Sequence, residues 1–312
     1  MNDQINLEEF RKDGISAERF ASFVKSQLFQ NSSNKSHYSI SDDKIVEIFK
    51  FFDEDQDGYL NKSEYDELEE KWLSCILKPR CALIIVDIQN DFIDGSHAIE
   101  EFPANHRDCH PDNHISFIDN IDLWKPVAVD GQHLVSKESK NSIEPGNIVT
   151  FNTSFGQIDV NIHLKHCVQG TKGVDLHQDL KFIASAKRVF KGLNPELESY
   201  SAFGDDLGKQ PTELASILKS ANITDVFVCG IAYDYCVRAT ALGANALGYR
   251  TIVIDDACRG TDLVKIQRTK QELEDKACVL VRSDQVESMV KGLDRRPELA
   301  CYLYTKIVTS GN

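Results

Sequence analysis

The sequence predicts an α/β protein: a doubly wound, mostly parallel sheet with helices on both faces, preceded by a small all-helical module. Short runs rich in β-branched residues recur after residue 80 and do not alternate with polar residues. Helix-like stretches separate several of these runs, a pattern typical of parallel strands buried on both faces. Before residue 75, apolar residues instead repeat at helical spacing, as in Ile45, Ile48, Phe49 and Phe52.

The composition changes at Lys78-Pro79-Arg80, which we take as a module boundary. We therefore expect a helical module over residues 1–76 and an α/β domain over residues 77–312. The helices expected in the module are residues 15–29, a helix that begins after Ser41 as its N-cap, and residues 62–73. The strands expected in that domain are residues 81–86, 147–151, 188–190, 225–229, 250–255 and 278–281. The expected helices are residues 211–221, 234–247, 262–275 and 284–290. Apart from 147–151, residues 119–164 show weak periodicity and are expected to form an elaborated loop region.

Composition excludes several classes of function. The 312 residues carry a formal net charge of -14, which argues against a nucleic-acid partner because phosphate binding requires a basic face. The best apolar run, residues 81–86, is too short to span a membrane, and the polar N-terminus does not resemble a signal peptide. The nine cysteines are odd in number and contain no CxxC pair, which indicates a reducing compartment. We expect a cytoplasmic protein, and the nucleus is also compatible.

Residues 53–64, DEDQDGYLNKSE, match the twelve-residue calcium loop of an EF-hand. Gly58 allows the sharp turn at position six, and Leu60 is the apolar residue at position eight. The predicted calcium ligands are Asp53, Asp55, Asp57, the carbonyl of Tyr59, and Glu64. EF-hands usually pair, and residues 12–36 are a candidate degenerate partner that lacks the ligand pattern. The loop fits a structural calcium ion as well as it fits a sensor.

Three reactive side chains follow expected strands of the larger domain. Asp87, Lys191 and Cys236 each stand at or just past such a run, and ligands of open α/β sheets bind at the carboxyl ends of the strands. Cys236 begins a helix, where the helix dipole and a nearby ammonium group favour the thiolate. A carboxylate, an ammonium and a thiol at one edge form a set suited to amide hydrolysis.

A second cluster has the composition of a metal site. The segment 108–114, DCHPDNH, places Asp108 and His110 two residues apart, so that they share a side of an extended segment. His166 is a candidate third ligand. Imidazole and carboxylate ligands suit zinc, manganese or iron(II) at a catalytic site.

These residues together resemble the nicotinamidase family, within the isochorismatase-like cysteine hydrolases. The resemblance covers about residues 81–281. The motifs that carry it follow the family's order: VDIQNDF (86–92), DCHPDNHISF (108–117), HCVQGT (166–171), FKG (190–192), ESYSAF (198–203) and GIAYDYCVRATALGA (230–244).

The resemblance implies roles for individual residues. The implied catalytic triad is Asp87, Lys191 and Cys236, and the implied metal ligands, which hold an ion on the pyridine nitrogen of the substrate, are Asp108, His110 and His166. His114 is left in a supporting role. The implied oxyanion hole consists of the backbone N–H groups of Ala232 and Cys236, with a cis peptide bond between Ile231 and Ala232. The implied aromatic pocket residues are Phe92, Tyr200 and Tyr235.

The sequence departs from the family at the pocket. Cys109 replaces one tryptophan, and residues 162–165, IHLK, replace a segment that usually contains a Trp-Pro pair. Trp124 is a candidate substitute for the missing pocket tryptophan. His163 is an alternative metal ligand, because it precedes His166 by three residues.

The function implied by the resemblance is hydrolysis of nicotinamide to nicotinate and ammonia through a cysteine thioester, in NAD salvage. It implies one divalent transition metal, with zinc foremost and manganese or iron as alternatives, besides calcium at the EF-hand. The expected partner is the small-molecule substrate, and the oligomeric state stays open. A related amidase or ureidohydrolase is one alternative function. A calcium-dependent binding protein built on an inactive hydrolase is another.

Overall fold

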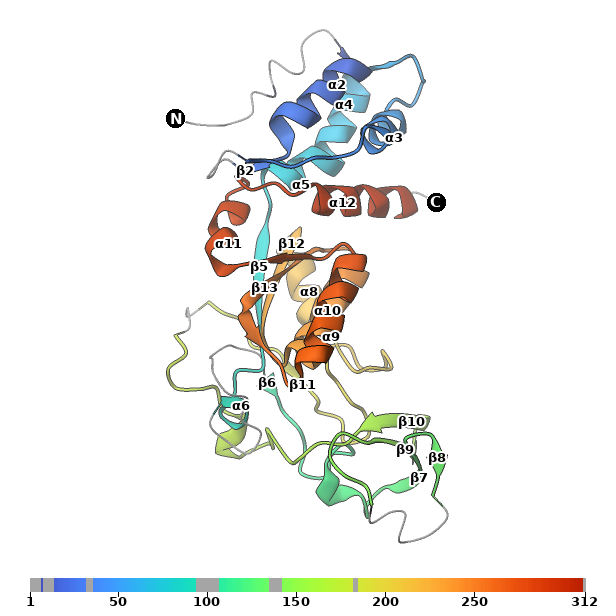
Figure 1. Cartoon of the computed structure of the whole chain (residues 1–312), viewed down its shortest axis with the longest axis vertical. Helices are drawn as coiled ribbons and strands as arrows, with labels where there is room; N and C mark the ends of the chain where they lie inside the picture. Colours follow the sequence, from blue (N-terminus) through green and yellow to red (C-terminus); the bar gives the residue numbers. More distant parts are fainter. Residues whose placement is uncertain are drawn as a thin grey trace.

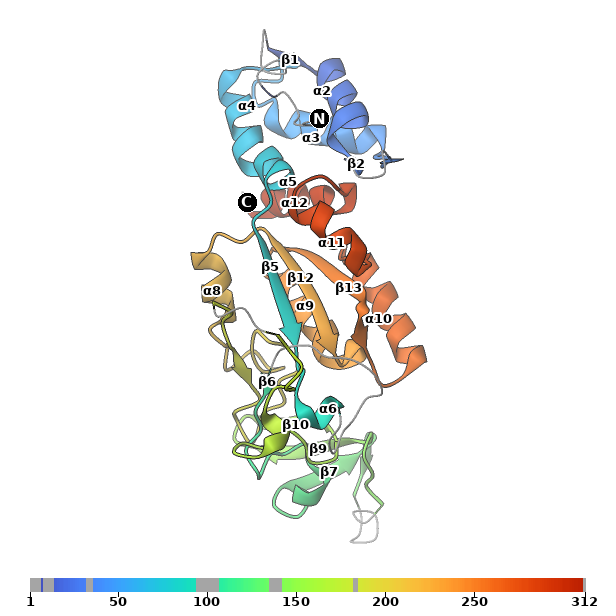
Figure 2. The ribbon, with the colours of Figure 1, turned by 90° about the vertical axis from the view of Figure 1, so that its left-hand side faces the viewer.

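The computed structural model describes residue 7 and residues 14–31, 36–93, 107–134, 142–181 and 185–310. Three parts follow one another along the long axis of the molecule (Figure 1, Figure 2). The N-terminal helices occupy one end, a layer of parallel strands and helices lies in the middle, and a small antiparallel sheet occupies the other end. No helix within these described ranges is long and apolar enough to cross a membrane.

Four parallel strands form the central sheet in the order β14-β13-β12-β5. They are β5 (Cys81–Val86), β12 (Asp225–Ile231), β13 (Arg250–Arg259) and β14 (Val279–Val281). Every residue of β12 is buried, as the absence of polar alternation predicts for a strand covered on both faces. The expected parallel sheet is confirmed for these four strands.

Helices cover this sheet. They are α8 (Leu214–Ser220), α9 (Arg238–Ala246), α10 (Leu263–Asp275) and α11 (Ser283–Val290), each within a few residues of an expected helix. Helices α9 and α10 lie to one side of the strands and α11 to the other (Figure 1). Asp262 caps α10 by accepting a hydrogen bond from the backbone N–H of Lys265 at 2.8 Å. Side chains of the sheet and helices, including Val226, Ile252 and Leu273, form one buried core.

Within residues 119–164 the expected strand at 147–151 is confirmed as β9, but the expectation of a loop region over the rest was wrong. This region contains a four-stranded antiparallel sheet in the order β10-β9-β7-β8. Its strands are β7 (Lys125–Val129), β8 (Gln132–His133), β9 (Ile148–Thr153) and β10 (Gly156–Asn161). Few side chains of each strand are buried, and they pack in a small separate core with Ile115 and Ile162. The apolar signal is therefore sparse, because short strands with few buried positions need few apolar residues.

The N-terminal helices form where apolar residues repeat at helical spacing. Helix α2 (Ala17–Phe23) continues into a π-helical turn, η1 (Val24–Leu28), and α3 spans Asp42–Phe52. Helix α4 (Lys62–Leu68) continues through η2 (Glu69–Leu73) into α5 (Ser74–Leu77). Ser41 caps α3 as expected, accepting from the N–H of Lys44 at 3.3 Å. Trp72, Phe20 and Phe29 are fully buried at the centre of the module.

The acidic loop at 53–64 pairs with the start of the described chain. Strand β4 (Tyr59–Leu60) lies antiparallel to β1 (Ile15–Ser16), with Leu60 opposite Ile15. A second short pair joins β2 (Gln30–Asn31) to β3 (Ser36–His37). The segment before α2 thus occupies the side of the loop where a partner hand would lie. Residues 32–35 and most of 1–13 lie outside the described residues.

The C-terminal helix α12 (Pro297–Ser310), to which the sequence analysis assigned no element, lies between the N-terminal helices and the sheet layer (Figure 1, Figure 2). Ala300 and Tyr304 belong to the N-terminal core, whereas Leu299 belongs to the core of the sheet. The expected division at residues 76 and 77 assigns α12 to the α/β domain, yet its side chains are shared between both cores.

Arg250, which forms a buried ion pair within the central sheet, also links the sheet to the N-terminal helices. The guanidinium of Arg250 contacts the Asp225 carboxylate at 2.5 Å and donates to the carbonyl of Cys75 in α5. We predict that Arg250→Ala lowers the free energy of unfolding by about 3–5 kcal/mol, because it leaves a buried carboxylate unpaired. Urea denaturation measures this. The matched control is Arg282→Ala at an exposed ion pair, which should cost under about 1 kcal/mol. Equal losses in the two variants would contradict the assignment.

Candidate active site

Strand ends bring the three reactive side chains together. Asp87 directly follows β5, and Cys236 lies in η5 (Tyr233–Val237), the π-helical turn after β12. Lys191 ends the short strand β11 (Phe190–Lys191), which pairs in parallel with β6 (Arg107–Asp108) and places Lys191 opposite Asp108. β11 and β6 form a separate two-stranded sheet, so the expected strand at 188–190 is shifted to Phe190–Lys191 and does not belong to the four-stranded sheet. The pair nevertheless brings Lys191 and Asp108 to the groups that follow β5 and β12.

A glycine allows the two strands that carry Asp87 and Cys236 to approach closely. Gly230, near the end of β12, has a φ of 127°. A Cβ atom at this position would lie 2.2 Å from the carbonyl oxygen of Val86. Only glycine tolerates both this positive φ and so close an approach of the neighbouring backbone, because it has no Cβ atom. The peptide bond between Ile231 and Ala232, just after this glycine, is cis, as the family resemblance implies.

The ammonium group of Lys191 lies at the centre of the site. Its Nζ atom is 3.0 Å from Asp87 Oδ2, 2.5 Å from Asp108 Oδ1 and 3.3 Å from Cys236 Sγ. It also donates to the carbonyl of Ser199 at 3.1 Å. All these side chains are buried, and Asp87 has no solvent exposure. One buried cation thus holds two carboxylates and a sulfur within reach of one another.

Burial has the largest effect on the pKa values of Cys236 and Asp87. Burial raises the pKa of the Cys236 thiol well above its usual value, although the Lys191 ammonium acts in the opposite direction. The effect of Lys191 is the one that the sequence predicts, and it acts against the larger effect of burial. Burial and the Asp108 charge raise the pKa of Asp87 to about 6, against the lowering effect of Lys191. A carboxyl with such a pKa is suited to act as a base near neutral pH.

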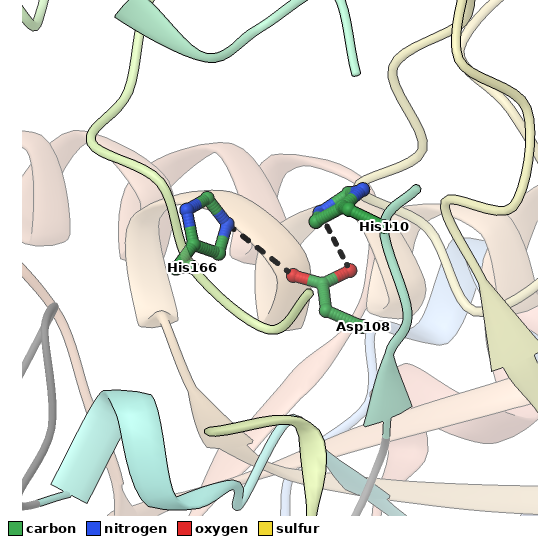
Figure 3. Close-up of side chains that lie close together, drawn as sticks. All are labelled: Asp108, His110 and His166. Carbon is green, nitrogen blue, oxygen red and sulfur yellow. Dashed lines mark ion pairs between the residues drawn. The ribbon is translucent and has the colours of Figure 1, made fainter. Parts of the chain in front are cut away.

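Asp108, His110 and His166 form a group whose ligand atoms lie within 4.8 Å of one another. Figure 3 shows both imidazole rings turned toward the Asp108 carboxylate. His110 Nε2 is 3.6 Å from Asp108 Oδ1, and His166 Nε2 is 3.9 Å from Asp108 Oδ2. These separations leave room for an ion between the three side chains.

The remaining ring nitrogens fix both histidines for metal binding. Nδ1 of His110 lies 3.2 Å from the carbonyl oxygen of Gly192, and Nδ1 of His166 lies 2.7 Å from that of Leu164. Each Nδ1 can donate its proton there, which leaves the Nε2 lone pair for a metal, the arrangement typical of histidine ligands. Burial holds the pKa of His166 well below its usual value and keeps it neutral. These described residues can hold a divalent metal ion.

The structure shows where the alternative metal ligand His163 and the candidate pocket residue Trp124 lie. His163 Nε2 lies 2.9 Å from the hydroxyl of Tyr200, and the metal-ligand group contains His166 and not His163. Trp124 donates to the carbonyl of Asn113 at 3.2 Å and packs against the small core of the antiparallel sheet, so it does not line the cavity. His163 itself forms the wall, edge-on to the rings of Tyr200 and Tyr235.

One cavity joins the two clusters. Its lining includes Cys236, the three candidate metal ligands Asp108, His110 and His166, and the expected pocket residues Phe92, Tyr200, Ala232 and Tyr235, whereas Asp87 and Lys191 are not part of the lining. His114 lies outside this lining, held between Ser116 and the carbonyl of Leu197, in keeping with a supporting role. The thiol of Cys236 and the three side chains that can hold a metal ion thus face a common space with aromatic walls.

Sequence reasoning missed one acidic residue of this cavity. Glu198 lines it, and burial raises the pKa of its carboxyl to about 7. Its Oε2 atom is buried without a hydrogen-bond partner in the part of the chain that the structure describes. The available signal was its place as the first residue of ESYSAF, the motif that also supplies Tyr200.

Comparisons with known proteins agree with this site. The Isochorismatase domain family matches residues 81–285, which begins at β5 and contains every residue of the two clusters. The chain belongs to the isochorismatase family. The matched region excludes residues 1–80, and therefore the acidic loop.

The curated relatives that it resembles include nicotinamidases. The chain is 32% identical to the nicotinamidase of Escherichia coli over 206 residues, covering 59% of this chain and 85% of that protein. It is 32% identical to the nicotinamidase of Saccharomyces cerevisiae over 219 residues, covering 62% and 94%.

Solved structures give the same result. An Acinetobacter nicotinamidase aligns with a TM-score of 0.55 and 31% identity over 66% of this chain and 98% of that one. The yeast nicotinamidase bound to the inhibitor nicotinaldehyde aligns with a TM-score of 0.54 and 27% identity, over 65% and 100%.

A glycine beside His110 gives a test of the metal-ligand geometry. A Cβ atom at Gly192 would lie 2.5 Å from Cε1 of His110, so we predict that Gly192→Ala displaces the imidazole. Metal bound per chain, measured by elemental analysis, should fall at least about tenfold. The matched control is Gly208→Ala, because Gly208 has a similar φ of 65° against 70° but a Cβ there meets open space. Full metal content in both variants would show that His110 does not hold the ion.

Proposed function

We infer that the protein is a nicotinamidase, an amide hydrolase that converts nicotinamide to nicotinate and ammonia and serves NAD salvage. The observation that carries this inference is the single cavity that joins Cys236 to Asp108, His110 and His166. A site for acyl transfer requires a nucleophile, a base and an anchored substrate in one space. The nicotinamidase relatives in bacteria and yeast support the same activity.

The substrate is placed by the cavity wall and the metal ligands. We assign Phe92, Tyr200 and Tyr235 to the wall that faces the pyridine ring, with His163 in the same wall. Asp108, His110 and His166 are assigned as ligands of one divalent ion, with zinc as the ion that best suits two imidazoles and a carboxylate. Such an ion, when bound, anchors the ring nitrogen and so orients the carboxamide toward Cys236.

Acylation begins with a proton transfer. Asp87 takes the proton of the Cys236 thiol, and the sulfur attacks the amide carbon. The backbone N–H groups of Ala232 and Cys236 hold the oxyanion. The C–N bond then breaks, and the leaving nitrogen receives the proton from Asp87, so that ammonia departs and a thioester remains.

Deacylation reverses the roles. Asp87 takes a proton from water, whose oxygen attacks the thioester carbon, and the sulfur leaves and recovers its proton as nicotinate is released. Throughout, the ammonium of Lys191 keeps a positive charge beside the sulfur and the two carboxylates. It stabilises whichever of these groups is negative at each step.

The principal test is removal of the nucleophile. Cys236→Ala should lower ammonia release from nicotinamide at least about a thousand-fold, because no thioester can form. Metal content and circular dichroism should stay unchanged. Cys229→Ala is the matched control, since it removes another buried thiol, of β12, that does not line the cavity. Turnover at the wild-type rate in Cys236→Ala would exclude the mechanism.

The pH profile tests Asp87 as the base. The raised pKa of about 6 means that the carboxylate form is lost as the pH falls through 6. We predict that kcat/KM drops about tenfold per pH unit below this value, whereas an unperturbed aspartate would place the decline near about 4. Glu198→Gln separates the Asp87 carboxyl from the Glu198 carboxyl, whose pKa is also raised, to about 7, because the decline should persist in this variant. A decline that disappears with Glu198 would assign it to that residue.

A sister amidase or ureidohydrolase is the alternative within the family. The metal-ligand group favours a substrate with a ring nitrogen, because that group lies in the same cavity as the nucleophile. A panel of aromatic carboxamides and ureido compounds separates the two. Preference for a ureido compound would favour the alternative. The binding-protein alternative is disfavoured by the complete set of Asp87, Lys191 and Cys236.

We propose calcium binding at residues 53–64, with Asp53, Asp55, Asp57, the Tyr59 carbonyl and Glu64 as ligands. Carboxylate oxygens of the three aspartates lie within 4.8 Å of one another. Asp53 is buried, and its Oδ1 atom has no hydrogen-bond partner among the described residues. Glu64 accepts from the backbone N–H groups of Glu54 and Asn61, so its carboxylate already faces the loop. Hard oxygens in this arrangement suit Ca²⁺.

We also propose a helical EF-hand module over residues 1–76, a hydrolase domain over residues 77–312, and a cytoplasmic location. The change from helices to parallel strands at β5 supports the division. All nine cysteines are free thiols, which supports a reducing compartment.

A further inference from the structure

The C-terminal helix α12 carries its apolar residues at the spacing of a groove-binding helix. The side chains that pack against the N-terminal module stand at positions i, i+3, i+4, i+7 and i+8: Ala300, Leu303, Tyr304, Ile307 and Val308. Amphipathic target helices dock into the grooves of helical calcium-binding proteins through this spacing. The N-terminal module therefore holds a helix of its own chain in the manner of a bound target.

The helical segments on both sides of the acidic loop, α3 and the continuous α4–η2 segment, contact α12. On the entering side, the ring of Phe51 in α3 meets the ring of Tyr304 edge-on at 5.6 Å. The Tyr304 hydroxyl also donates to the carbonyl of Glu47 at 3.3 Å. On the exiting side, Trp72 in η2 donates from Nε1 to the carbonyl of Ala300 at 2.9 Å. A change in the angle between α3 and the continuous α4–η2 segment would therefore alter these contacts with α12.

The opposite side of α12 reaches the catalytic domain. Leu299 packs in the core of the parallel sheet, and the Tyr302 hydroxyl donates to the carbonyl of Asn245 in α9. Helix α9 follows η5 without a break, and η5 contains Cys236. A continuous set of packed groups thus joins the acidic loop to the helix of the nucleophile.

We propose that α12 is the built-in target helix of the N-terminal module, and that calcium binding at residues 53–64 is coupled through it to the catalytic domain. The proposal rests on the calcium site proposed above. Calcium in a sensor hand reorients the flanking helices and strengthens the hold on a target helix. Coupling between two sites is reciprocal, so the affinity for calcium must depend on how firmly α12 is held.

Titration calorimetry of the full chain with calcium alone tests this coupling. Tyr304→Ala removes the ring that contacts Phe51, and we expect it to weaken calcium binding by a factor of about 5 to 150, the usual range of coupling between sites. The control is Thr305→Ala, one residue away on the exposed side of α12, which should change the affinity less than about twofold.

This experiment separates failure of the coupling from failure of the calcium site. Calcium binding of wild-type strength in Tyr304→Ala overturns the coupling and leaves the calcium site intact. No calcium binding by the wild-type chain overturns the calcium site and the coupling together, while the nicotinamidase assignment stands on its own assay.

Hydrogen exchange on the wild-type chain gives a second test that does not depend on the folding of Tyr304→Ala. Calcium should slow amide exchange over residues 303–308 at least about fivefold, and Glu64→Gln should abolish that change. Identical exchange of these amides with and without calcium overturns the proposal.

Discussion

The buried ammonium group of Lys191 is the interaction on which the site depends. Asp87 and Asp108 are both buried, and two carboxylates in such a place repel one another and lose their hydration. Lys191 lies within ion-pair distance of both and 3.3 Å from the sulfur of Cys236. It therefore connects the Asp87 carboxylate, the Cys236 sulfur and the group that can hold a metal ion, which come from segments far apart in the sequence.

The fold exists in this form because parallel strands end at a common edge. β5 and β12 deliver Asp87 and the turn that contains Cys236, and the close approach at Gly230 sets the distance between them. The pairing of β11 with β6 adds Lys191 and Asp108 in register. The small antiparallel sheet continues into residues 161–166, where His163 and His166 complete the cavity. Each part of the domain thus contributes one wall or one reactive group.

Much of this arrangement was predictable from the sequence. The central strands and their helices have strong periodic signals. Asp87 and Cys236 follow β5 and β12 directly, so their meeting at one edge followed from topology, whereas Lys191 reaches them from a separate two-stranded sheet. The sheet over residues 125–161 was not predictable, because few of its side chains are buried. The burial of Cys236, which raises its pKa, is a tertiary property that the sequence does not show. The role of His163 in the wall, and the sharing of α12 between two cores, depend on contacts between segments distant in sequence.

The proposed mechanism requires that a single ligand reaches both the sulfur of Cys236 and an ion held by Asp108, His110 and His166. A crystal structure of the zinc-loaded protein with nicotinaldehyde tests it most directly. The account predicts a covalent bond between Cys236 Sγ and the aldehyde carbon, with the pyridine nitrogen of the same molecule bound to the zinc ion. Zinc held by other residues, or an aldehyde bound away from Cys236, would contradict it.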